Sequence, residues 1–175
     1  MTDSSIERPQ AGQSPARSEP KASEAAKLAP FGLVLHHDGR WSHEGQPILH
    51  RRLREHFDRS VVYLPDEQKF VVTLRHFRGE IAVEEAAFFV REIELASGVL
   101  ALSDRTREPL DVASLHVSPR DGALLCRVKR ALAPAGLLAR FTHSAQAELL
   151  AAIEPDGAGY ALALGGRRER VPALG

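Results

Sequence analysis

The sequence contains very little cysteine, since Cys126 is the only one among 175 residues. A single cysteine excludes an intrachain disulfide and any cysteine-based zinc cluster, which fits a reducing compartment. We expect Cys126 to be a small buried apolar side chain, because free cysteine packs in this way when nothing lowers its pKa.

Long apolar runs and an excess of one charge are also missing. No stretch approaches the ~20 consecutive apolar residues that cross a bilayer. The first five residues offer neither a basic n-region nor an apolar h-region, so a secretory signal is not indicated. Lysine plus arginine and aspartate plus glutamate both total 23, so no overall field attracts nucleic acid or an anionic membrane. We expect a cytoplasmic protein that uses neither as a partner.

Catalytic and metal-binding motifs are absent as well. Gly-x-Ser-x-Gly does not occur, and the members of Ser42–Glu44 are adjacent in sequence instead of converging from separate elements. Gly165–Gly166 is expected between strands and not before a helix, so it does not form a phosphate loop. His36 and His37 are neighbours on a predicted strand and should point to opposite faces, which does not suit one metal ion. We expect no enzyme, no cofactor and no metal.

The composition divides the chain into a tail and two lobes. Residues 1–30 hold four prolines among small and polar residues and almost no large apolar side chains, which predicts a disordered tail. Its four acids balance its four bases, so a neutral tether is a better interpretation than a partner-docking arm. We expect an N-terminal α+β lobe over residues 31–111 and a C-terminal α+β lobe over residues 112–175.

The N-terminal lobe begins with a predicted hairpin around Asp38-Gly39. Pro47 suits the first helical position, and an apolar face follows it, so a helix is expected over about residues 48–58. Residues 60–64 and 70–74 are rich in β-branched and aromatic side chains and predict a second hairpin. Three further strands are expected, at residues 81–83, 88–95 and 99–102.

The C-terminal lobe repeats this local plan. A hairpin is expected around Asp121-Gly122, an apolar stripe predicts a helix over about residues 137–153, and a last hairpin follows at residues 160–173. Both ends of the chain thus run hairpin, helix, hairpin. We interpret this order as an internal duplication with mostly antiparallel sheets, although any α+β protein can produce such an order by chance.

The segment Asp38–Ile48 (DGRWSHEGQPI) resembles the opening signature of the bacterial domain-of-unknown-function family 1285. The residues 70–73, 83–88, 125–129 and 139–149 and the final Gly-Gly hairpin follow in that family's order, so the resemblance covers about residues 33–174. It implies a duplicated core whose second half is pleckstrin-homology-like. It also implies a groove between the halves that is suspected of holding a nucleotide-like ligand, with no established activity.

The sequence departs from the family's pattern at two places. Leu74-Arg75-His76-Phe77 stands where the family usually has Pro-Val-Glu-Lys, and Ala87 replaces the usual proline. If that strand end faces the ligand, Arg75 and His76 substitute a cationic, donating pair for an acid and a base. An anionic ligand would tolerate this change.

A second group of basic residues could complete such a site. Strand alternation places Arg127 and Lys129 on the face opposite Leu124, Cys126 and Val128. On the predicted helix, Arg140 and His143 are spaced i, i+3 and share a face. Guanidinium groups there could bind a phosphate or carboxylate bidentately, although Arg127 and Lys129 can equally be ordinary outward-facing side chains.

Charge is uneven along the chain. Residues 48–78 carry seven bases and four acids, whereas residues 80–111 carry three bases and eight acids. The two segments can simply face each other across a surface. Alternatively, the basic helix segment His50–Arg54 can dock on phosphate, but many surface helices bear this many arginines as a solvated face.

Trp41 admits two interpretations. It can be a buried plug between the first hairpin and the first helix, or a stacking platform for a base. Our hypothesis is a non-enzymatic protein, with a possible role in signal transduction, that binds a small anionic, nucleotide-like ligand between two lobes. The residues of the hypothetical site are Trp41, Arg75, His76, Arg127, Lys129, Arg140 and His143. The alternative is a protein-interaction module that uses an exposed sheet edge and its charged faces.

Overall fold

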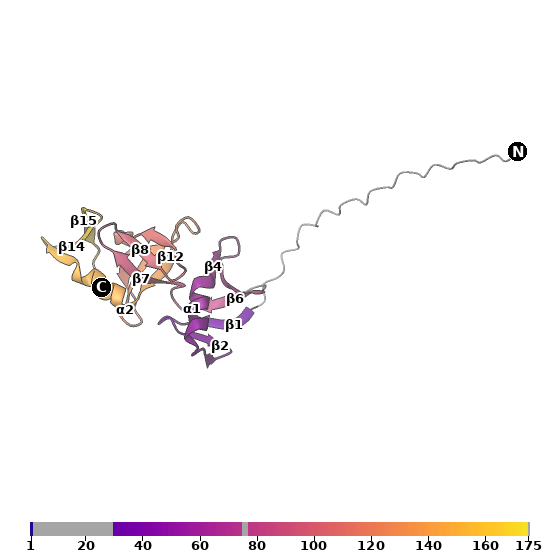
Figure 1. Ribbon diagram of the computed structural model, residues 1–175. Coiled ribbons are helices and arrows are strands. Elements are labelled where there is room, and N and C mark those ends of the chain that lie inside the picture. Colours follow the sequence, from indigo (N-terminus) through magenta and orange to yellow (C-terminus); the bar gives the residue numbers. More distant parts are fainter. Residues whose placement is uncertain (2–29, 75–76, 175) are drawn as a thin grey trace.

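The structure is an α+β protein built mostly from antiparallel sheets, as the sequence predicted (Figure 1). The computed structural model describes Met1 and residues 30–74 and 77–174. The first sheet has six strands in the order β3-β2-β1-β6-β5-β4, and the second has six in the order β10-β11-β12-β7-β8-β9. A third sheet of three strands, β13-β14-β15, follows near the end of the chain. The predicted disordered tail lies outside the described residues, apart from Met1 and Pro30.

The strand and helix bounds bear out most of the predicted hairpins. The first sheet contains β1 (Pro30–Leu35), β2 (Trp41–His43), β3 (Gln46–Pro47), β4 (Val61–Leu64), β5 (Lys69–Leu74) and β6 (Phe77–Val83). The second contains β7 (Phe88–Glu94), β8 (Val99–Leu102), β9 (Arg107–Pro109), β10 (His116–Val117), β11 (Leu124–Val128) and β12 (Leu137–Phe141). The third contains β13 (Ile153–Asp156), β14 (Gly159–Leu164) and β15 (Arg167–Val171). The helices are α1 (Arg51–Ser60), the short 3-10 helix η1 (Val112–Ser114) and α2 (His143–Ala151).

The two six-stranded sheets have the same topology. In each, two three-strand meanders are joined so that the first and last strands lie parallel at the centre of the sheet, as β1 and β6 in one and β7 and β12 in the other. Helix α1 connects the meanders of the first unit, and η1 occupies the equivalent place in the second. The structure is therefore consistent with the predicted duplication.

The copies nevertheless correspond differently from the prediction. The Asp38-Gly39 turn joins the first two strands of its unit, whereas Asp121-Gly122 joins the fourth and fifth strands of the other. The counterpart of Asp38-Gly39 is instead the turn that contains Gly98, between β7 and β8. The error arose because Asp-Gly pairs report a local turn and carry no information on which strands pair across a sheet.

Along the chain, the boundary between the two units lies after β6, not at residue 111. Strands β7, β8 and β9, which the prediction assigned to the N-terminal lobe, belong to the second sheet. The expected lobe boundary at residues 111 and 112 therefore falls inside the second unit, just before η1. A short linker, residues 84–87, joins the units and lies between β6 and β7.

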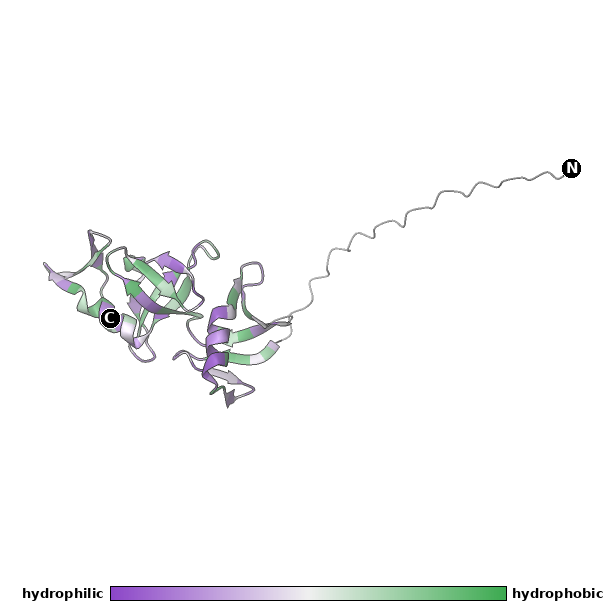
Figure 2. Ribbon diagram, in the orientation of Figure 1, coloured by the Kyte–Doolittle hydropathy of each residue, from purple (hydrophilic) through white to green (hydrophobic). Residues whose placement is uncertain are grey.

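Helix α1 begins later than the prediction placed it. Pro47 belongs to β3, where a missing N–H is harmless at a sheet edge, and it does not start the helix. His50 is the N-cap, and its Nδ1 accepts a hydrogen bond from the backbone N–H of Leu53 at 3.3 Å. Most of α1 is hydrophilic (Figure 2), and Phe57 is its buried residue.

Only part of the predicted second helix is helical. Residues 137–141 form strand β12, and α2 covers residues 143–151. The side chains of Leu137, Ala139 and Phe141 alternate into the core, and β12 pairs with β11 on one side and β7 on the other. Pairing with two neighbouring strands outweighs an apolar stripe that also fits a helical period.

The apolar core is continuous through the molecule. Buried residues of both six-stranded units and of the third sheet belong to one cluster. Cys126 is fully buried in it, and burial raises the pKa of its thiol to about 12. Its side chain is therefore the inert apolar filler that the sequence predicted. Among the described residues, no helix has the length and apolar character that crossing a membrane requires.

Candidate functional site

The seam between the two six-stranded units is largely filled by apolar side chains. Phe70 of β5 meets Phe88 of β7 with ring centroids 6.4 Å apart. The added Cβ of an alanine at Gly39 would lie 3.3 Å from the ring of Phe89, so the β1–β2 turn of one unit rests directly on β7 of the other. Among the described residues, polar side chains gather at two places along the seam that are candidates for a functional site.

The first place is the linker between the units. Glu84 is hydrogen-bonded to both histidines of the β1–β2 turn. The Nδ1 atoms of His36 and His37 lie 2.7 and 3.1 Å from its two carboxylate oxygens. The backbone N–H of His37 donates to the same carboxylate at 3.1 Å. The prediction that these histidines point to opposite faces is wrong, because β1 ends at Leu35 and both lie in the turn beyond it.

The hydrogen bonds from His37, on its ring and its backbone, and from the ring of His36 lower the pKa of Glu84 to about 2. A carboxyl group whose pKa is lower in the folded than in the unfolded protein stabilises the fold above its unfolded pKa. That stabilisation is lost as the pH falls from 4.5 towards 2.

We expect Glu84→Gln to be less stable than the wild type at pH 6 and to approach the wild type in stability as the pH is lowered through this window. Urea unfolding of both proteins between pH 6 and pH 2.5 measures the difference. Glu92→Gln is the control, because Glu92 is exposed on β7 and forms no ion pair with a described residue. A gap between Glu84→Gln and the wild type that stays constant with pH would contradict the role of the two histidines.

The neighbouring Glu85 is a buried carboxylate with three polar partners. Its side chain is 8% exposed; it accepts hydrogen bonds from Ser118 Oγ at 2.6 Å and from Arg140 Nη1 at 3.2 Å. Arg120 Nε lies 4.0 Å away. Arg140 also binds Asp121 with both terminal nitrogens, which lowers the pKa of Asp121. We call His36, His37, Glu84, Glu85, Ser118, Asp121 and Arg140 the linker network.

The second place is a cleft of about 260 Å³ where α1 and the β1–β2 turn face β7 and the start of α2. We call it the seam cleft. Three guanidinium groups converge on it, two from α1 and one from β7. Its lining residues are Asp38, Gly39, Arg51, Arg54, Glu55, Asp58, Phe89, Arg91 and Thr142.

Most charges of the seam cleft are already paired. Asp58 accepts hydrogen bonds from Trp41 Nε1 at 2.8 Å and from Arg91 Nη2 at 2.5 Å. Burial raises the pKa of Asp58 although these donors oppose the shift. Arg51 pairs with Glu55 one turn along α1, at 3.4 Å. The carboxylates of the cleft therefore have cationic partners within the protein.

Arg54 is the exception. Its Nε is buried and has no hydrogen-bond partner, and its side chain forms no ion pair with any residue that the structure describes. A buried donor without a partner costs about 1–3 kcal/mol, so such groups usually meet a ligand or ordered water. The charge of Arg54 acts on Asp58, but its guanidinium is not hydrogen-bonded to any described residue, so the seam cleft can supply it to an anion.

Trp41 occupies the position of a plug. It is 1% exposed, packs on Phe57 with ring centroids 5.2 Å apart, and donates its indole N–H to Asp58. Neither face of its ring is open to a base, so the stacking interpretation does not describe it. Arg75 and His76 lie outside the described residues, and their place in the site stays a prediction.

Arg127 and Lys129 do not share a face as strand alternation implied. Lys129 follows the end of β11 with a φ of 58°, and its side chain turns inwards to 9% exposure. Its ammonium lies 2.8 Å from Asp104 and 3.1 Å from Glu108. Arg127 donates to the carbonyl of Gly136 at 3.1 Å. Both cations are thus engaged within the second unit and do not line the seam cleft.

Of the remaining predicted residues, Arg140 lies in the linker network and is held by its two acids. His143 is exposed at the first position of α2, next to Thr142, which lines the seam cleft. The sequence analysis did not predict that Arg91 lines the cleft. The other two arginines of the cleft, Arg51 and Arg54, belong to the basic segment His50–Arg54, which was the feature of the sequence that indicated them.

Two solved structures resemble the chain, and both are described as DUF1285 family proteins. One, from Silicibacter pomeroyi DSS-3, matches with a TM-score of 0.57 and 18% identity, covering 82% of this chain and 80% of that one. The other, from Shewanella baltica OS155, matches with a TM-score of 0.47 and 12% identity, covering 70% of this chain and 91% of that one. No family model and no curated protein matches the sequence. The resemblance seen in the sequence is thus confirmed at the level of the fold.

Proposed function

We propose that this protein is a non-enzymatic binding protein that holds a small anion of the nucleotide type, bound through a phosphate, in the seam cleft. The observation that carries the proposal is the buried, unpartnered Nε of Arg54 in a cleft that two further guanidinium groups line. Guanidinium groups bind phosphate oxygens bidentately and stay charged at every physiological pH. A protein that binds such a ligand without altering it would act as a sensor of that ligand. Sensing of this kind is consistent with a role in signal transduction.

The size of the cleft limits what it encloses. Small-molecule pockets usually measure ~300–1,000 Å³, and the seam cleft, at about 260 Å³, suits the phosphate end of a ligand better than a whole nucleotide. Phe89 lines the cleft and is 7% exposed, so little of its ring is open to a base. We infer that the phosphate enters the cleft and that the rest of the molecule lies along the surface of α1.

The pairing of the carboxylates supports binding over catalysis. Asp38 pairs with Arg40 at 2.6 Å, and Asp58 is held by Trp41 and Arg91. A general acid or base must be free to exchange a proton with its substrate. The carboxylates of Asp38 and Asp58 are instead bound to cations and hydrogen-bond donors of the protein itself.

Recruitment of a protein through a sheet edge is the less favoured alternative. Each sheet carries a proline on an edge strand, Pro47 on β3, Pro109 on β9 and Pro155 on β13. Proline cannot donate to a ladder, and charged residues such as those of β15 also discourage strand addition. At least one edge of each sheet therefore resists the pairing that this alternative needs, whereas β4, at the other edge of the first sheet, carries neither proline nor charge.

Binding is tested by thermal shift and isothermal titration of the full chain with inorganic phosphate, AMP and a cyclic dinucleotide at low and high salt. A ligand at 100 times its dissociation constant should stabilise the fold by about 2.7 kcal/mol. We expect Arg54→Gln to weaken binding at least tenfold, because a hydrogen bond to a charged group is worth ~1.5–3 kcal/mol.

Arg52→Gln is the matched control. Arg52 is exposed on the same helix, two residues away, and does not line the cleft, so its replacement should change the affinity by less than about twofold. A flat ligand panel, or equal losses for Arg54→Gln and Arg52→Gln, would remove the seam cleft from consideration.

A further inference from the structure

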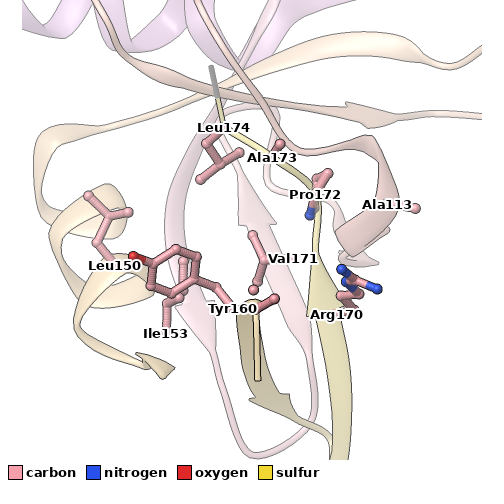
Figure 3. Close-up of a pocket in the computed structure, with 11 residues that line it drawn as sticks. Ala113, Leu150, Ile153, Tyr160, Arg170, Val171, Pro172, Ala173 and Leu174 are labelled. Atoms are coloured by element: carbon pink, nitrogen blue, oxygen red, sulfur yellow. The ribbon is translucent and has the colours of Figure 1, made fainter. Parts of the chain in front are cut away.

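A second and larger concavity lies at the other end of the molecule. It is a groove of about 790 Å³ formed by the third sheet, the end of α2, η1 and the segment after β15 (Figure 3). We call it the C-terminal groove. Its lining residues are Ala113, Leu150, Ile153, Ala158, Gly159, Tyr160, Arg170, Val171, Pro172, Ala173 and Leu174. It shares no residue with the seam cleft.

The walls of the C-terminal groove expose large apolar side chains. Leu150 of α2 is 44% exposed and Tyr160 of β14 is 60% exposed. Figure 3 shows both beside Ile153 on one side of the groove, with Val171 between them and Arg170. A contiguous apolar surface of this kind inside a concavity is typical of a binding site, because leaving it in water is unfavourable.

One cation borders this apolar surface. The backbone of Arg170 belongs to the β14–β15 ladder, but its side chain forms no hydrogen bond or ion pair with any residue that the structure describes. Arg168, two positions earlier on β15, approaches Glu154 at 3.5 Å and Asp156 at 3.6 Å. Glu154 and Asp156 of β13 are therefore engaged by Arg168, and the guanidinium of Arg170 is left to a partner from outside the described chain.

We propose that the C-terminal groove binds an amphipathic carboxylate of the medium-chain fatty-acid class. The alkyl chain packs on Leu150, Ile153 and Val171, and the carboxylate binds the guanidinium of Arg170. An apolar wall with one uncommitted cation at its rim complements a ligand with one anionic end and an otherwise apolar body.

Isothermal titration of the full chain with hexanoate, octanoate and decanoate, below the concentrations at which they form micelles, tests the proposal. We expect one site per chain and an affinity that rises up to about fourfold for each added methylene while the groove still has room. Decanol, which has the same chain without the charge, measures the apolar part alone.

Three variants separate the contributions. Arg170→Gln should weaken decanoate binding on the order of tenfold and leave decanol unchanged, because it removes a hydrogen bond to a charged group. Arg167→Gln is the matched control on the same strand, exposed and outside the groove, and should change neither ligand. Leu150→Asp should weaken both ligands, and circular dichroism verifies that it folds, as expected for a residue on the exposed side of α2.

The proposal is overturned if decanoate fails to bind at millimolar concentration, if affinity does not depend on chain length, or if Arg170→Gln and Arg167→Gln behave alike. These outcomes leave the seam cleft untouched, because phosphate binding there depends on Arg54 and not on any residue of the C-terminal groove. Conversely, loss of anion binding in Arg54→Gln should leave decanoate binding unchanged.

Discussion

Trp41→Ala is expected to lower the free energy of unfolding by about 4 kcal/mol, because truncating a buried tryptophan costs ~3–5 kcal/mol. Trp41 is 1% exposed and fills the space between the first hairpin and α1, where its ring packs on Phe57. The truncation removes this packing and also takes one hydrogen-bond donor from the partly buried Asp58. The remaining stability would be marginal, since domains are usually stable by only ~5–15 kcal/mol.

Urea unfolding followed by far-ultraviolet circular dichroism measures this loss, because the variant no longer has a tryptophan to report by fluorescence. Trp41→Phe separates the two effects: it keeps most of the packing and should cost only about 1–3 kcal/mol for the lost donor. Leu49→Ala is the control, since Leu49 is 80% exposed and should change stability by less than about 0.5 kcal/mol. A loss of under 1 kcal/mol in Trp41→Ala would show that Trp41 is not a structural plug.

The second large effect is expected at the linker between the units. Arg140→Ala should lower the free energy of unfolding by about 3 kcal/mol, because removing one partner of a buried ion pair costs ~3–5 kcal/mol. The side chains of Arg140 and Glu85 are 12% and 8% exposed. Ser118 remains as a donor to Glu85, which places the expected loss at the lower end of that range.

A double-mutant cycle shows whether the loss belongs to this pair. Glu85→Gln in the background of Arg140→Ala should recover part of the stability, because it removes the carboxylate that the single variant leaves unpaired. Arg168→Ala is the control for an exposed ion pair and should cost no more than about 1 kcal/mol. If Arg140→Ala is no more destabilising than Arg168→Ala, the linker network does not fasten the units together.

Most strands could be predicted from the sequence, but the order in which they pair within the sheets could not. Runs such as residues 70–74 and the turns beside them are local signals, so most hairpins were found where the structure has them. The parallel pairs β1 with β6 and β7 with β12 join segments that no local pattern connects. Residues 137–141 show the same limit, because their strand form depends on neighbours on both sides.

The candidate site was predictable only where its residues lie close together in sequence. The basic segment His50–Arg54 was visible, and two of its arginines line the seam cleft. Arg91 comes from the other unit, and only the folded chain shows that it faces Asp58. Lys129 was misplaced because a positive φ after β11 breaks the alternation from which its direction was inferred.

The parallel strands at the centre of each six-stranded sheet have a consequence for how the chain folds. Leu33 of β1 pairs with Ile81 of β6, and Phe88 of β7 pairs with Ala139 of β12. The central parallel pair of each sheet cannot form until the last strand of that sheet has emerged from the ribosome. Contacts between segments so distant in sequence also slow folding. Because β6 precedes β7 in the chain, the first unit can finish folding while the second is still being synthesised.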